Sequence, residues 1–277
     1  MQEKYLFFDM DGTLISPATH HILPSSIEGI KKAQEKGARV FLCTGRGYGL
    51  ALEYQDELDV PGVIFSNGGG IAYDGKILET RDIQPRIVKE MIDRIDSLGG
   101  GYQILGTNYC WQNQKEHNRF ASRFPSQYPE LTVEQVFERK AMRLFDEYDG
   151  GSIQKIDFNF DSELTADWFF AKIPASLNVV MSGGYYAHLG RRGGELMCEG
   201  TSKGQAIKRV LDMFGASYRD AYGFGDSMND IEMLKVCGHS IAMGNAIEDV
   251  KKCADSVTND ADHDGIYNAL KHFEIID

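Results

Sequence analysis

Two carboxylates stand two positions apart at the end of an apolar run. The residues Tyr5-Leu6-Phe7-Phe8 have the character of a buried strand and lead directly into Asp9-Met10-Asp11-Gly12-Thr13-Leu14. In extended backbone, residues i and i+2 project to the same side, and the glycine that follows allows a sharp turn and a close approach to a ligand. An Asp-rich turn is the structural alternative, but this pattern indicates an active-site carboxylate pair.

Three further polar segments have a similar setting. Cys43-Thr44-Gly45-Arg46 comes directly after the apolar Val40-Phe41-Leu42, and Gly225-Asp226-Ser227-Met228-Asn229-Asp230 comes after Ala221-Tyr222-Gly223-Phe224. Between them, Lys203 opens a helix-like stretch. Like carboxylates about 5 Å apart repel each other by roughly 3 kcal/mol per pair at an effective dielectric constant of about 20. A site that gathers these acids therefore requires cations.

The elements that must position these residues alternate between strand and helix. Strand-like runs cover residues 5 to 8, 38 to 43 and 62 to 66, and an amphipathic stretch from residue 25 to 36 lies between the first two. A hairpin is predicted over residues 71 to 78. Alternating βαβ units imply a parallel sheet with ligands at the carboxyl ends of its strands, where all the polar segments lie.

The pattern changes between Gln84 and Arg192. Helices are predicted near residues 86 to 98, 115 to 124 and 164 to 172. Residues 102 to 111 are hairpin-like, and strand-like runs lie near residues 153 to 160, 177 to 181 and 185 to 189. None of the polar segments falls in this part of the chain. We therefore expect an inserted α+β region that does not supply the catalytic residues.

Taken together and in order, the polar segments resemble the four motifs of the haloacid dehalogenase superfamily: DxDGT, a Ser or Thr after a strand, a Lys, and GDxxxD. Residues 241 to 246 and 264 to 266 look like the closing segments of its Cof-type branch. The resemblance covers essentially the whole chain. It implies an α/β fold with a doubly wound, Rossmann-like parallel-sheet core, residues 1–83 and 193–277, and an inserted α+β cap for substrate specificity, residues 84–192.

The resemblance also implies roles for the acidic residues. Asp9 would be the nucleophile that forms an aspartyl-phosphate, and Asp11 would be the general acid and base. Mg²⁺ would be bound by Asp9, Asp226 and the backbone carbonyl of Asp11, since a hard cation prefers oxygen ligands. Asp230 would not bind the ion itself but would hold the metal-binding residues in position.

Phosphate and substrate contacts complete the expected site. Thr44, Gly45, Lys203 and Asn229 are expected to bind the phosphoryl group, with a hydroxyl and a point charge among the donors. Side chains expected to contact the rest of the substrate are Arg46, Tyr186, His188, Arg191 and Arg192. For the last four, the alternative is a sheet with one solvated face.

We therefore expect Mg²⁺-dependent hydrolysis of small phosphomonoesters. Sugar phosphates are the first class implied by the resemblance, and pyridoxal phosphate and flavin mononucleotide are further candidates. A phosphomutase of the same superfamily is the alternative enzyme, because it shares the motif set. A catalytically retired protein that senses phosphometabolites is the alternative from another functional class.

Composition is consistent with a cytoplasmic enzyme. The 277 residues carry a formal net charge of -12 and a pI near 5.1, which argues against nucleic acid or an anionic membrane as a partner. No apolar run is long enough to span a bilayer, and no signal sequence is evident. The five cysteines form no CxxC pair, so neither a disulfide framework nor a zinc site is indicated. We expect a monomer or a weak homo-oligomer.

Overall fold

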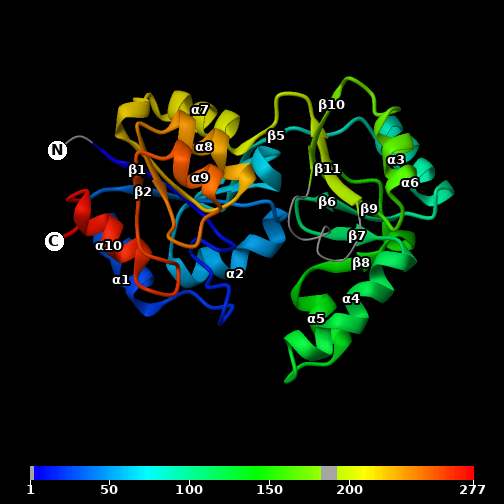
Figure 1. The fold of residues 1–277 in the computed structure, drawn as a ribbon, viewed down its shortest axis with the longest axis horizontal. Coiled ribbons are helices and arrows are strands. Elements are labelled where there is room, and N and C mark those ends of the chain that lie inside the picture. The colour runs from blue at the N-terminus through cyan, green and yellow to red at the C-terminus, as the bar shows by residue number, and fades with distance from the viewer. Residues whose placement is uncertain (1–2, 182–191) are drawn as a thin grey trace. The chain divides into compact units, whose positions relative to one another are not determined.

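The computed structural model describes residues 3–181 and 192–277, and the chain divides into two compact units (Figure 1). The first unit comprises Met1–Gly45, Ala51–Glu79 and Ser202–Asp277. The second comprises Arg46–Leu50 and Thr80–Thr201. Among the described residues, no helix combines the length and apolar character needed to cross a membrane.

The first unit is built on an eight-stranded sheet with the strand order β14-β13-β12-β1-β2-β3-β4-β5. The strands from β14 to β3 pair in parallel, and β4 pairs with β3 in the antiparallel sense. This arrangement confirms the doubly wound parallel sheet. The strands are β1 (Tyr5–Asp9), β2 (Arg39–Cys43), β3 (Gly62–Phe65), β4 (Gly70–Tyr73), β5 (Lys76–Thr80), β12 (Ala221–Gly225), β13 (His239–Ala242) and β14 (Ser256–Val257).

Helices cover both faces of this sheet (Figure 1). Phe7 and Phe41 project toward α7 and α8, where they join a buried cluster with Ile207 and Met233. Each large apolar side chain that is fully buried stabilises the fold by about 1.5–3 kcal/mol. On the opposite face, α1 packs against α10. The helices of this unit are α1 (Pro24–Glu35), α2 (Tyr48–Leu58, which begins in the second unit), α7 (Lys203–Phe214), α8 (Ile231–Val236), α9 (Glu248–Cys253) and α10 (Gly265–His272).

The second unit contains a six-stranded sheet with the strand order β10-β11-β9-β6-β7-β8. All pairs are antiparallel except β7 with β8. Its strands are β6 (Gly101–Gly106), β7 (Cys110–Gln112), β8 (Met142–Leu144), β9 (Ile153–Phe160), β10 (Leu177–Met181) and β11 (Arg192–Cys198). Its helices are α3 (Pro85–Ser97), α4 (Gln114–Gln127), α5 (Val133–Arg139) and α6 (Glu163–Phe170).

The central strand β9 shows why this sheet has two unlike faces. Ile156 and Phe158 belong to an apolar cluster that includes residues of α3 and α6. On the other face, the buried Lys155 ammonium lies 3.0 Å from an Asp157 carboxylate oxygen and donates to Glu195 at 2.9 Å. Because alternate residues of a strand point to opposite faces, one strand lines both the core and a polar surface.

Several elements differ from the sequence-based expectation. The elements predicted within the described residues lie near their expected limits, but α2, α5, β8 and β11 were not predicted, and neither were α8, α9, α10, β13 and β14 toward the C-terminus. Strand β11 continues the second sheet to Cys198, beyond residue 192, the predicted end of the inserted region. The strand predicted at residues 185 to 189 lies outside the described residues.

Candidate active site

Residues at the ends of β1, β2 and β12 meet at the carboxyl edge of the first sheet. Strand β1 lies between β2 and β12, so the direction of winding reverses there. Ligands of open α/β sheets bind outside the carboxyl ends of the strands at such a switch point. Asp9 ends β1, Thr44 follows β2, and Asp226 follows β12. The sequence motifs are thus brought together by strand order.

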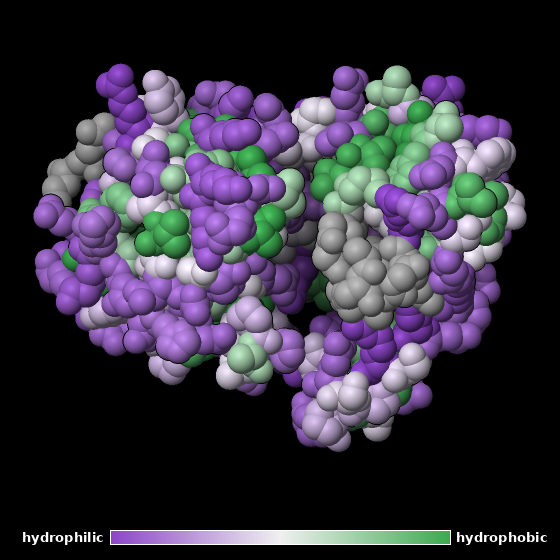
Figure 2. Space-filling model, viewed as in Figure 1, coloured by the Kyte–Doolittle hydropathy of each residue, from purple (hydrophilic) through white to green (hydrophobic). Residues whose placement is uncertain are grey.

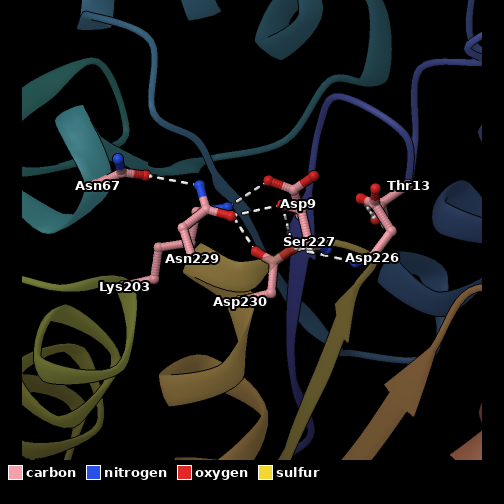
Figure 3. Close-up of polar contacts among 8 residues, drawn as sticks. All are labelled: Asp9, Thr13, Asn67, Lys203, Asp226, Ser227, Asn229 and Asp230. Atoms are coloured by element: carbon pink, nitrogen blue, oxygen red, sulfur yellow. Dashed lines mark hydrogen bonds and ion pairs between the residues drawn. The ribbon is translucent and has the colours of Figure 1, made fainter. Parts of the chain in front are cut away.

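A buried lysine ties these segments together. The Nζ atom of Lys203 donates to Asp9 Oδ1 and, at 2.6 Å, to Asp230 Oδ1 (Figure 3). Lys203 is fully buried, and Asp9 is only 5% exposed. Lys203 is the first residue of α7, where the helix dipole disfavours a positive charge. The two carboxylates therefore have to stabilise this ammonium.

The pKa of Lys203 reflects this balance. Burial by itself would lower the pKa, but Asp230 and Asp9 raise it above its ordinary value. The lysine consequently stays charged at neutral pH. It links β1 to the loop after β12 through one ammonium group.

Asp230 holds the loop that presents Asp226. Its Oδ2 atom accepts hydrogen bonds from the backbone N–H groups of Asp226 at 3.0 Å and Ser227 at 2.9 Å. Its Oδ1 atom accepts from Lys203. With both oxygens bound to protein donors, Asp230 fixes the shape of this loop.

Asp226 is oriented by the loop after β1. Its Oδ1 atom accepts from Thr13 Oγ1 at 2.9 Å. Gly12 has φ +93°, and a Cβ atom at this position would lie 2.5 Å from Asp226 Oδ2. Glycine is therefore required here both for its backbone conformation and for space. Asn245, which the sequence analysis did not assign, donates to the carbonyl of Gly12 at 2.7 Å and braces the same loop.

The three acids form a group that suits a hard divalent cation. Asp9, Asp226 and Asp230 each offer an oxygen, and these oxygens lie within 4.8 Å of one another. Burial, with the charge of Asp230, raises the pKa of Asp226 to about 6 and that of Asp9 well above its ordinary value. Three carboxylates face one ammonium, so a bound cation would offset the excess negative charge. Oxygen ligands of this kind fit Mg²⁺.

The predicted phosphate-binding residues lie beside this group. Thr44 is buried, and its backbone is held by Ile64 O at 2.8 Å and Asn67 N at 2.9 Å. Asn229 Nδ2 donates to Asn67 Oδ1 at 3.1 Å (Figure 3). A Cβ atom at Gly45 would lie 3.2 Å from the same Asn67 oxygen. Asn67 thus contacts two of the predicted segments.

The other predicted residues have different surroundings. Asp11 is exposed on the loop after β1, and Arg46 is half-buried within the second unit. Arg192 is exposed at the start of β11 and forms an ion pair with Glu163. Tyr186, His188 and Arg191 lie outside the described residues.

Comparisons with known proteins agree with this geometry. The model of the haloacid dehalogenase-like hydrolase family matches residues 6–270. Phosphatase YwpJ of Bacillus subtilis (strain 168) is 26% identical, over 97% of this chain and 99% of its own length. Pyridoxal phosphate phosphatase YbhA of Escherichia coli (strain K12) is 26% identical, over 96% and 97% of the two chains. The solved structure of the subclass IIB sugar phosphatase BT4131 has a TM-score of 0.76 at 29% identity and covers 99% of this chain and 100% of its own.

Proposed function

Because this chain belongs to the haloacid dehalogenase-like hydrolases and is a phosphatase of the Cof-type branch, we propose that it hydrolyses small phosphomonoesters with Mg²⁺ through an aspartyl-phosphate. Sugar phosphates are the first substrate class we propose. The observation that carries this proposal is the buried Lys203 ammonium between Asp9 and Asp230, at the sheet edge that also holds Thr44 and Asp226.

Asp9 is the proposed nucleophile. Lys203 binds Asp9 Oδ1, so Oδ2 attacks phosphorus in line while the bond from phosphorus to the leaving oxygen breaks. Splitting hydrolysis into two transfers replaces one difficult step with two easier ones. A water molecule then attacks phosphorus, inorganic phosphate leaves, and the Asp9 carboxylate is regenerated.

Asp11 is the proposed proton carrier. It donates a proton to the leaving alcohol in the first transfer and takes one from the attacking water in the second. These roles require a side chain within reach of the leaving oxygen and of the attacking water, and the exposure of Asp11 leaves its carboxyl group accessible to water. A carboxyl group at this position can release and take up a proton in successive steps, so Asp11 favours turnover.

The cation and the phosphoryl donors complete the chemistry. Asp9, Asp226 and the Asp11 carbonyl are the proposed Mg²⁺ ligands, with Asp230 holding the Asp226 loop. The ion would neutralise charge on the phosphoryl group. The proposed phosphoryl-binding groups are Thr44, Gly45, Lys203 and Asn229, which act as preorganised donors for the charge that develops during transfer.

Specificity is proposed to reside in the inserted region, residues 84–192. The core motifs contact the phosphoryl group, which all substrates share, so contacts to the leaving group must discriminate between substrates. The relatives support two classes, because BT4131 is named a sugar phosphatase and YbhA a pyridoxal phosphate phosphatase. Flavin mononucleotide remains a third candidate.

A hydrolysis screen tests this proposal. Hexose and pentose phosphates, pyridoxal phosphate and flavin mononucleotide would be incubated with Mg²⁺, and the release of inorganic phosphate would be measured against Asp9→Asn. One sugar phosphate with far higher kcat/KM than the others would identify the substrate. Conversion of a sugar phosphate to its isomer without phosphate release would indicate a mutase. Binding without turnover would indicate a sensor.

A further inference from the structure

The loop after β3 contains three successive residues in the left-handed region. Ser66, Asn67 and Gly68 have φ values of 50°, 53° and 92°. Asparagine and glycine adopt this conformation with little strain, but L-residues in general avoid it, and runs of it are rare. Such backbone persists only where the surroundings hold it, and it gathers at functional sites.

Neighbouring segments hold this turn in place. Asn67 N donates to Thr44 O at 2.9 Å, after β2, and Gly69 N donates to Ser66 O at 3.0 Å. Gly68 packs against the residue that precedes Lys203, since a Cβ atom at Gly68 would lie 2.2 Å from Ser202 O. The Ser66 hydroxyl is buried and has no hydrogen-bond partner among the described residues. Backbone hydrogen bonds and packing against Ser202 therefore hold the turn, and the Ser66 hydroxyl does not contribute to it.

The turn presents the side chain of Asn67 to the active site. Asn67 is only 2% exposed, and its Oδ1 atom accepts from Asn229 Nδ2 at 3.1 Å (Figure 3). Asn229 Oδ1 in turn accepts from Ser227 Oγ at 2.6 Å. One asparagine thus connects the segment after β2 through its backbone with the segment after β12 through its side chain.

We propose that Asn67 is a positioning residue, which holds Asn229 and the Thr44–Gly45 segment at a fixed separation for the phosphoryl group. This inference rests on the proposed phosphatase function. A turn that needed only a left-handed residue would be satisfied by glycine. The hydrogen bond to Asn229 gives the Asn67 amide a role that glycine could not fill. A fixed spacing of the phosphate donors matters, because a misplacement of about 1 Å can cost roughly 100-fold in rate.

Asn67→Gly separates the backbone role from the amide role. Glycine accepts the left-handed conformation and removes only the side chain. We expect kcat/KM for an aryl phosphate to fall roughly 10- to 100-fold, chiefly in kcat, while the thermal unfolding midpoint stays close to that of the wild type. Asn268→Ala is the matched control, because it removes another Asn–Asn hydrogen bond of 3.1 Å, between Asn268 and Asn259. Its kinetics should be unchanged.

A double-mutant cycle with Asn229→Ala tests whether the Asn67 side chain acts through Asn229. If Asn67 acts through Asn229, Asn67→Gly should have little further effect once Asn229 is alanine. Multiplicative losses would overturn the inference and indicate independent contacts. Wild-type kinetics for Asn67→Gly, or a loss that follows the unfolding midpoint, would also overturn it. An inactive wild-type protein would instead contradict the proposed function itself.

Discussion

Lys203 Nζ lies 2.6 Å from Asp230 Oδ1, and neither side chain has any solvent exposure. An ion pair without water keeps nearly its full electrostatic strength, but each partner depends on the other for compensation. Asp9 shares the same ammonium. Each buried charge in this arrangement therefore depends on the others, and the ammonium fixes two carboxylates with proposed roles in chemistry.

Removing this ammonium should destabilise the fold strongly. Lys203→Met keeps the length of the side chain but leaves Asp9 and Asp230 buried without their cation. Breaking a buried ion pair in this way typically costs about 3–5 kcal/mol. Urea unfolding would measure the change, with Lys208→Met as the control, since Lys208 is exposed on the same helix. A loss below about 1 kcal/mol would show that the acids find other compensation.

Asp9→Asn should abolish turnover without unfolding the protein. The amide is close in shape to the carboxylate, but it is neither a nucleophile nor a good cation ligand. We expect kcat to fall at least about 1000-fold, with circular dichroism and the unfolding midpoint preserved. A loss of only a few-fold would remove Asp9 from the role of nucleophile.

The stability of the cation-free protein should depend on pH in a defined direction. Asp226 has an ordinary pKa of 3.8 and a raised pKa of about 6 in the folded state. The folded state therefore binds more protons than the unfolded state between these values, so stability falls as pH rises from about 4 to about 6. The shift corresponds to at most about 3 kcal/mol.

Urea unfolding with a chelator, repeated from pH 4 to pH 7, measures this slope. Asp226→Asn should make the slope smaller, because the amide does not titrate, while the raised pKa of Asp9 maintains the rest of it. At pH 7, Mg²⁺ at about 100 times its Kd should add about 2.7 kcal/mol to the wild type. A chelated protein that gains stability over the same interval would contradict the assignment.

The convergence of the motif segments could be predicted from the sequence because parallel strands place their carboxyl ends at one edge. Asp9 ends β1 and Asp226 follows its neighbour β12, so the order of the strands brings these two residues together. The bonds of Lys203 to Asp9 and Asp230 could not be predicted, because they depend on where α7 begins relative to β1. The contact between Asn67 and Asn229 likewise joins residues from distant parts of the chain.

Two of the helices that were not predicted, α2 and α5, were missed for different reasons. The buried side of α2 is formed by Tyr48, Ala51, Gln55 and Leu58, which include a small and a polar residue, so its hydrophobic periodicity is weak. In α5, Thr132 and Gln135 form a capping box, a signal visible in the sequence that would have located the helix.

Asp11→Asn should slow both transfers, because one residue serves as acid in the first and as base in the second. An activated aryl phosphate, whose leaving group needs no proton, should rescue the first transfer more than the second. The aspartyl-phosphate should then accumulate and be detected by mass spectrometry of the Asp9 peptide after a rapid acid quench. Absence of the phosphorylated peptide would count against this role.

The inserted region should control substrate ranking and leave the chemistry unchanged. Alanine at Tyr186, His188, Arg191 or Arg192, introduced singly, should alter the relative kcat/KM of sugar phosphates by roughly 1–3 kcal/mol wherever a side chain contacts the leaving group. Small aryl phosphates should be nearly unaffected, because they lack the groups that such side chains would bind.

Arg192 allows the sharpest form of this experiment, because it forms an ion pair with Glu163. Glu163→Gln removes the partner and keeps the arginine, so it separates loss of the ion pair from loss of the guanidinium. If Arg192 binds substrate, Arg192→Ala should change the ranking and Glu163→Gln should not. Equal changes in both variants would assign Arg192 a structural role. If all four alanine variants keep the wild-type ranking, specificity must be sought in residues 84–183.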